Sequence, residues 1–74
     1  MNKPFTKGMR IRVTEDNGDP LSGKSGVVIR VLMRDPYEAW VAMDEPIPAT
    51  MAKFPDDDER RNHVCLDADF VEEV

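Results

Sequence analysis

The sequence has a single cysteine, Cys65, and no long run of apolar residues. One cysteine cannot form a disulfide within the chain, so the protein has no need of an oxidising compartment. The first residues lack the apolar stretch of about 7–15 residues that a signal peptide requires. No segment approaches the roughly 20 apolar residues of a membrane span. We therefore expect a cytoplasmic protein without membrane association.

The sequence also lacks a set of residues that would support catalysis or metal binding. Its only histidine, His63, lies two positions before Cys65, and on a strand the two side chains would face the same way. Two such residues fall short of the four ligands of a zinc site, and a nucleophile seldom meets its base at this spacing. We interpret the pair as a histidine beside a buried thiol. We expect no enzymatic activity, no catalytic residue, no metal and no cofactor.

Positive charge is scarce as well. The chain has 10 Lys and Arg against 15 Asp and Glu, which gives a net charge of −5. A negative protein repels polyanions, so nucleic acid is the less favoured partner. The acidic run at 56–59 lacks the ligand spacing of an EF-hand loop, and we expect it to be solvated. Most basic residues lie in the first half of the chain, which still permits a local basic face.

The 74 residues suffice for one small domain, and 41% of them are apolar, a proportion typical of folded chains. We expect a single domain over residues 1–74, with residues 1–7 as a flexible terminus. We also expect a monomer. So short a chain buries only a small core, and a deep substrate cavity is not expected.

Residues 9–14 are predicted to form the first strand. Three apolar residues alternate with polar ones there, namely Met9, Ile11 and Val13. This period of two is typical of a strand with one buried face. Residues 15–25 are predicted to be a long loop because they contain most of the turn-forming residue types. Near its end, Gly23 and Gly26 are expected to adopt the positive φ angles that a tight return of the chain requires.

Residues 27–33 and 39–43 are predicted to form an antiparallel hairpin, since the first segment is β-branched and a short proline-containing turn joins the two. Residues 45–62 contain three prolines and a charged run, which predicts a long loop. Residues 63–66 and 70–74 are predicted to be the last two strands, with a single 3-10 turn at 67–69. The fold class is therefore a small, all-β, five-stranded barrel.

This order of elements resembles an SH3-like barrel over residues 7–74. Residues 23–31 look like a KOW motif, in which a glycine and a following apolar pair build the first hairpin of ribosomal and transcription-elongation proteins. The same frame resembles the small ferredoxin-docking subunit of photosystem I, at residues 7–13 and 66–74. These resemblances imply a fold and a class of binding modules rather than a particular partner.

The two ways of aligning residues 27–31 disagree about which side chains are buried. Plain alternation places Val27, Ile29 and Val31 inside, whereas the resemblance places Val28 and Val31 inside. A β-bulge between these positions would reconcile them, because a small barrel must bend its strands. We predict such a bulge, with Val28 and Val31 the more buried residues.

Trp40 is the residue most suggestive of a binding surface. If Val41 points inward, Trp40 faces outward, beside Tyr37 and Phe54, and an exposed aromatic cluster indicates an interaction surface. The alternative is that the 45–62 loop covers Trp40 as part of a second small core. Both interpretations remain open from the sequence.

Four basic residues are candidates for a shared outer face of the first two strands: Arg10, Arg12, Lys24 and Arg30. Either they meet an anionic partner, or they keep the face wet and pair with Asp16, Asp19 or the 56–59 run, which contributes little stability. The function we expect is non-enzymatic binding of another protein. The alternative is a KOW-like contact with RNA through these four residues and Arg34, in translation or transcription.

Overall fold

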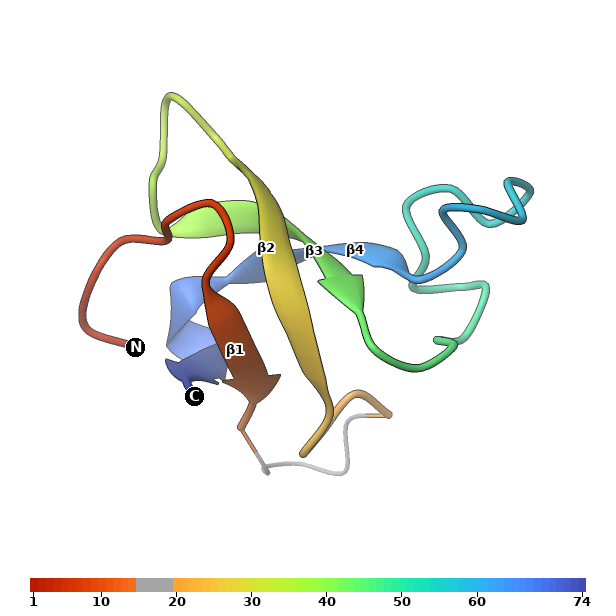
Figure 1. Ribbon diagram of the computed structural model, residues 1–74, viewed down its shortest axis with the longest axis horizontal. Coiled ribbons are helices and arrows are strands. Elements are labelled where there is room, and N and C mark those ends of the chain that lie inside the picture. The colour runs from red at the N-terminus through yellow and green to blue at the C-terminus, as the bar shows by residue number, and fades with distance from the viewer. Residues whose placement is uncertain (15–19) are drawn as a thin grey trace.

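The computed structural model describes residues 1–14 and 20–74 and contains one antiparallel β-sheet (Figure 1). Its elements are β1 (Arg10–Val13), β2 (Ser25–Val31), β3 (Glu38–Met43), β4 (His63–Asp67), the 3-10 turn η1 (Ala68–Phe70) and β5 (Val71–Glu73). Across the sheet the order is β4-β3-β2-β1-β5. The predicted all-β fold, with five strands and a 3-10 turn before the last of them, is confirmed. Residues 15–19, where the predicted 15–25 loop begins, lie outside the described residues.

The sheet curls around an apolar core, so that β1 and β2 lie across β4 in Figure 1. The inner faces of the strands supply most of the core: Ile11, Val13, Val28, Ala39, Val41, Met43, Val64 and Val71. Phe5, Leu21 and Ala68 complete it from outside the strands. Val41 points inward, which is the condition on which the prediction of an outward Trp40 depends, and Met9 is partly buried against the same core. Burial of this apolar surface is the main force that stabilises the sheet.

A register shift between Val28 and Arg30 interrupts the pairing of β2 with β3. Val28 pairs with Val41 and Arg30 pairs with Trp40, so Ile29 is the extra residue of a β-bulge. The predicted bulge is confirmed, and so is the burial of Val28, which is 1% exposed. Val31 packs against the core but remains half-buried, because it lies at the end of β2.

The two glycines near the start of β2 serve different purposes. Gly23 has a φ of 76°, as predicted for the return of the chain. The same prediction for Gly26 is wrong, because Gly26 does not have a positive φ. It lies so close to β3 that a Cβ atom would stand 2.7 Å from the carbonyl oxygen of Ala42 and 2.8 Å from Cγ1 of Val41. Gly26 therefore permits the close approach of two strands.

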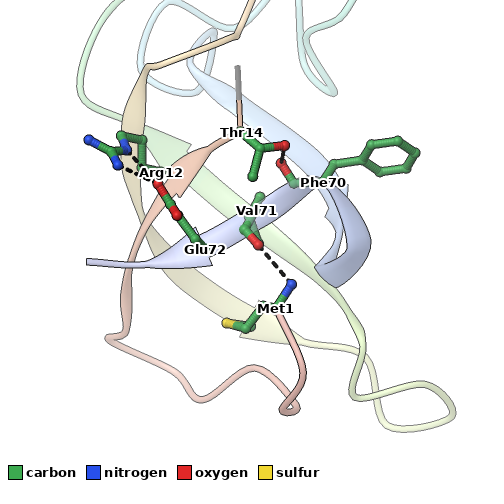
Figure 2. A network of polar contacts seen from close by, with 6 residues as sticks. All are labelled: Met1, Arg12, Thr14, Phe70, Val71 and Glu72. Atoms are coloured by element: carbon green, nitrogen blue, oxygen red, sulfur yellow. Dashed lines mark hydrogen bonds and ion pairs between the residues drawn. The ribbon is translucent and has the colours of Figure 1, made fainter. Parts of the chain in front are cut away.

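The chain reverses at η1, one residue later than predicted for 67–69. The reason is that Asp67 caps the turn, since its Oδ1 accepts a hydrogen bond of 2.9 Å from the backbone N–H of Asp69. The carbonyl oxygen of Phe70 then accepts hydrogen bonds from the backbone N–H and the hydroxyl of Thr14, at 2.9 and 3.1 Å. Figure 2 shows the hydroxyl contact, together with the Arg12–Glu72 ion pair that joins β1 to β5.

The segment before β1, for which the sequence predicts a flexible terminus, makes defined contacts in the structure. The amino group of Met1 donates hydrogen bonds to the carbonyl oxygens of Ala68 and Val71, at 2.7 and 2.9 Å, and Figure 2 shows the second of these. Phe5 is 4% exposed, and its N–H donates to the carbonyl oxygen of Pro36 at 2.8 Å. Residues 45–62 contain neither strand nor helix, in agreement with the predicted long loop.

We predict that Gly26→Ala lowers the free energy of unfolding by about 2–3 kcal/mol, because the added methyl group forces β2 away from β3. Gly8→Ala is the matched control, since a Cβ at Gly8 meets nothing within 4 Å and its cost comes only from a φ of 88°. We expect that cost to be about 1 kcal/mol. Urea denaturation of both variants measures the difference, and equal losses would contradict the close-approach interpretation.

Candidate functional site

Trp40 points outward from β3 and forms an aromatic cluster with Phe54 from the long loop and His63 from β4. The Trp40 and Phe54 ring centroids are 6.0 Å apart with an interplanar angle of 78°, an edge-to-face arrangement. Phe54 meets the His63 ring in the same way, at 6.2 Å and 72°. Edge-to-face contacts of this kind are favourable beyond the apolar area that they bury. The loop therefore packs onto the outer face of the sheet through Phe54.

Three cationic side chains lie over these rings. The guanidinium carbon of Arg30 is 5.0 Å from the Trp40 ring centroid, and Nζ of Lys53 is 4.3 Å from it. The guanidinium carbon of Arg60 is 5.3 Å from the Phe54 centroid. All three distances are within the range of cation–π attraction. We call Trp40, Phe54, His63 and these three cations the aromatic surface.

Backbone hydrogen bonds hold the loop in place around this surface. The N–H of Lys53 donates to the carbonyl oxygen of His63 at 2.8 Å, and the N–H of His63 donates to that of Arg60 at 3.0 Å. The side-chain amide of Asn62 donates to the carbonyl oxygen of Met43 at 2.7 Å. The loop projects beyond the ends of β3 and β4 in Figure 1, yet these bonds anchor both of its sides.

The structure combines the two interpretations that the sequence leaves open for Trp40. Its side chain is half-buried because Phe54 and Lys53 cover part of it, but the ring is not enclosed. Tyr37 is 45% exposed and lies elsewhere, since its carbonyl oxygen accepts a hydrogen bond from Ala68 at the start of η1. Of the three predicted aromatic residues, the structure thus brings together Trp40 and Phe54.

Arg10, Arg12 and Arg30 lie on the outer face of β1 and β2, in agreement with the prediction, but most of the predicted basic residues have carboxylate partners. Arg10 makes a bidentate contact with Asp44, at 2.9 and 2.6 Å, which holds the pKa of that carboxyl below its usual range. Arg12 pairs with Glu72, and Nζ of Lys24 lies 3.6 Å from Glu45. Of the four, Arg30 alone reaches the aromatic surface.

The expected pairing of these cations with the 56–59 run is wrong. That run pairs with its own neighbours, as Asp57 does with Arg60 at 3.1 Å and Asp58 with Arg61 at 3.7 Å. Short-range pairing is favoured because the loop returns on itself within one turn. The other expected partners, Asp16 and Asp19, lie outside the described residues.

Cys65 lies on the outer face of β4, in register with Trp40. The sequence-based expectation of a buried thiol is wrong, because Cys65 is exposed at the outer strand of the sheet. Its pKa is nevertheless raised, first by partial burial and then by the negative charge of Glu38, with Asp67 adding to the effect and Lys53 opposing it. A raised pKa lowers the thiolate population at neutral pH and disfavours a nucleophilic role.

Sequence reasoning missed Lys53 and Arg60, and it missed a pocket of about 410 Å³ beside β4. The pocket is lined by Val13, Leu21, Glu38, Met51, Val64, Cys65, Leu66, Asp67 and Phe70. Its walls come from separate parts of the chain, so no local sequence pattern predicts the pocket. The position of Lys53 over Trp40 is also hidden from the sequence, because it depends on how the loop returns to β4.

Two further observations bear on the kind of protein. In residues 1–14 and 20–74, no three His, Cys, Asp or Glu side chains gather closely enough to hold a metal ion. The same residues include no helix with the length and apolar character needed to cross a bilayer. Comparisons of the chain with family models, with curated proteins and with solved structures found no match.

We predict that Trp40→Ala lowers the free energy of unfolding by about 2 kcal/mol, because it removes a half-buried ring that holds the loop. In a double-mutant cycle with Phe54→Ala, the coupling should be about 1 kcal/mol, as expected for an edge-to-face pair. Urea denaturation supplies all four values. Tyr37→Ala, outside the aromatic surface, serves as the control with no coupling to Phe54→Ala. Strictly additive losses for Trp40 and Phe54 would show that the rings do not support each other.

We predict that Cys65 reacts with a thiol-specific disulfide reagent with a pH midpoint above that of a free cysteine. Glu38→Gln should lower this midpoint, because it removes a negative charge that disfavours the thiolate, and Lys53→Gln should raise it. The pH midpoint of each of the three proteins is obtained from the rate of thiol modification as a function of pH. A midpoint below that of free cysteine would contradict the assignment and reopen a nucleophilic role for Cys65.

Proposed function

We propose that this protein is a non-enzymatic binding module with an SH3-like barrel that contacts another protein, in the cytoplasm, through the aromatic surface. One observation carries the proposal. Arg30 and Lys53 lie on the Trp40 ring, and neither has a carboxylate within ion-pair distance in the described part of the chain. Their charge is thus available to an anionic group of a partner.

The residue types on the aromatic surface support recognition of a protein. Protein interfaces are enriched in tryptophan and arginine, which supply large contact areas and directional donors. Trp40 offers a partly open indole ring, and the two cations beside it would meet Asp or Glu side chains of the partner. The raised pKa of Cys65, which is in register with Trp40, supports a non-enzymatic role because it lowers the thiolate population beside this surface.

A KOW-like contact with RNA is supported less well. Arg10, Arg12 and Lys24 already have carboxylate partners, which reduces the positive field that phosphates would meet. Base stacking needs an open aromatic face, and Arg30 and Lys53 leave the Trp40 ring only partly open. The net charge of −5 acts in the same direction.

The proposal is tested with the double variant Arg30→Gln, Lys53→Gln. Partners of the wild-type chain are captured from extracts of the native host, and the affinity of each purified partner for wild type and variant is measured by titration. We expect the variant to bind at least about tenfold more weakly, since charge-assisted contacts at an interface are strong. The same loss should not occur in the matched control Arg10→Gln, Arg12→Gln, which changes the net charge equally.

Two results would contradict the proposal. The first is equal weakening by the test and control variants, because the effect would then follow net charge alone. The second is the repeated capture of no protein, together with tight binding of single-stranded RNA whose affinity falls steeply with salt. That outcome would favour the RNA-binding alternative.

A further inference from the structure

The outer edge of β4 is partly unpaired. In an antiparallel ladder, alternate residues direct their backbone N–H and C=O groups toward the neighbouring strand. The bonds from Met43 N–H to the Asn62 oxygen and from Ala68 N–H to the Tyr37 oxygen fix this alternation at both ends of the β3–β4 ladder. The backbone groups of Val64 and Leu66 therefore face β3, and those of His63, Cys65 and Asp67 face away from the sheet.

The long loop covers only the first part of this edge. The outward N–H and C=O groups of His63 are bonded to Arg60 and Lys53. Nothing in the described chain bonds to the outward N–H and C=O of Cys65 or to the outward N–H of Asp67. The carbonyl oxygen of Asp67 differs, because it belongs to the first turn of η1. An edge of this kind can accept a further strand through main-chain hydrogen bonds.

The apolar pocket lies directly beside this unpaired edge. Its apolar walls are Val13, Leu21, Met51, Val64, Leu66 and Phe70. Phe70 is 56% exposed, and its ring projects away from the sheet in Figure 2. A strand added to β4 would direct every second side chain to the inner side of the sheet, where Val64 and Leu66 lie. An apolar side chain at that position would fill the pocket.

The remaining side chains of such a strand would lie on the outer side, next to Glu38 and Asp67. These two carboxylates face each other in register across β3 and β4, and no basic side chain pairs with either of them among the residues described. The raised pKa of Cys65, which both carboxylates increase, supports their closeness to the edge. A basic side chain opposite Asp67 would therefore be favoured.

We propose that the N–H and C=O of Cys65 and the N–H of Asp67 bind an extended segment of another protein, in which apolar residues enter the pocket and alternate with basic residues that meet Glu38 and Asp67. This site is distinct from the aromatic surface and does not depend on Arg30 or Lys53. A second copy of the chain is a poorer occupant. Pairing two copies at this edge would bring two Glu38–Asp67 pairs together, and like charges across strands are destabilising.

The probe is a short acetylated peptide in which valine and lysine alternate. We expect it to bind the isotope-labelled protein with the largest amide shifts at residues 64–67 and with slowed hydrogen exchange of the Cys65 amide. Cys65→Pro should weaken binding at least about tenfold, because it removes an outward N–H that the fold does not use. Cys65→Ser is the matched control, since it keeps the N–H and should bind as wild type does.

The charge requirement is tested with Glu38→Lys and with a peptide in which valine alternates with glutamate. Wild type should prefer the lysine peptide, and Glu38→Lys should reverse or abolish that preference. A peptide of the same composition with its valines and lysines grouped should bind no better than background. The Arg30→Gln, Lys53→Gln variant should bind the lysine peptide at least as tightly as wild type, because it removes the Lys53 charge that acts on Cys65. This result separates the site from the aromatic surface.

Three results would overturn the proposal. They are equal binding by the Cys65→Pro and Cys65→Ser variants, amide shifts confined to other parts of the chain, and absence of binding by the alternating peptide. Sedimentation equilibrium tests whether a second copy of the chain occupies the edge. A dimer of the wild-type chain that Cys65→Pro dissociates would assign the edge to a second copy instead.

Discussion

The close approach of β2 to β3 is the constraint on which the rest of the structure depends. A Cβ atom at Gly26 would stand 2.7 Å from a β3 carbonyl oxygen, so only glycine allows the two strands to begin their pairing at this distance. Further along β2, the extra residue Ile29 changes the register and returns the inner face to Val31. A bulge increases the local twist of a strand, which lets the short sheet curl around its core. With β3 fixed in this way, Val41 is fully buried and Trp40 is directed outward.

The same constraint leaves the outside of the molecule for the binding that we propose. The inner faces are filled with apolar side chains, and no polar side chain is buried in the part of the chain that the structure describes. The reversal at η1 then takes the chain away from β4, because Asp67 caps the turn and Thr14 bonds to Phe70. The last strand pairs with β1 and leaves β4 as an edge. An outward indole and an unpaired edge thus result from one topology.

Local patterns in the sequence predict most of the fold. Alternation of apolar residues identifies β1 with its buried face, and the disagreement between two alignments of β2 correctly locates the bulge near Ile29. The prediction fails for Gly26 because φ is a local property, whereas its closeness to Ala42 depends on another strand. It fails for Cys65 because an alternating strand does not reveal whether it lies at the centre or the edge of a sheet.

The candidate site is less predictable than the fold for a related reason. Trp40 and Phe54 stand out as scarce aromatic residues, but only the path of the loop brings Phe54 and Lys53 onto Trp40. The partners of the basic residues depend in the same way on contacts between distant segments. Arg10 meets Asp44 across the sheet rather than an acidic residue of the neighbouring loop. Composition therefore predicts a mixed-charge surface without showing which charges are compensated.

The charged side chains that have no ion-pair partner within the described chain give the outer face of β3 and β4 one positive end and one negative end. Trp40 and Cys65 are paired across the strands, and Glu38 and Asp67 are paired two residues further along. Lys53 and Arg30 make the Trp40 end positive, while the two carboxylates make the other end negative. A partner that spans both ends must therefore present acidic groups to the first and basic groups to the second. The surface would therefore favour one orientation of such a partner over the reversed one, and would disfavour proteins that carry charge of a single sign. In this way electrostatic complementarity contributes specificity, even for a protein whose net charge repels other anions.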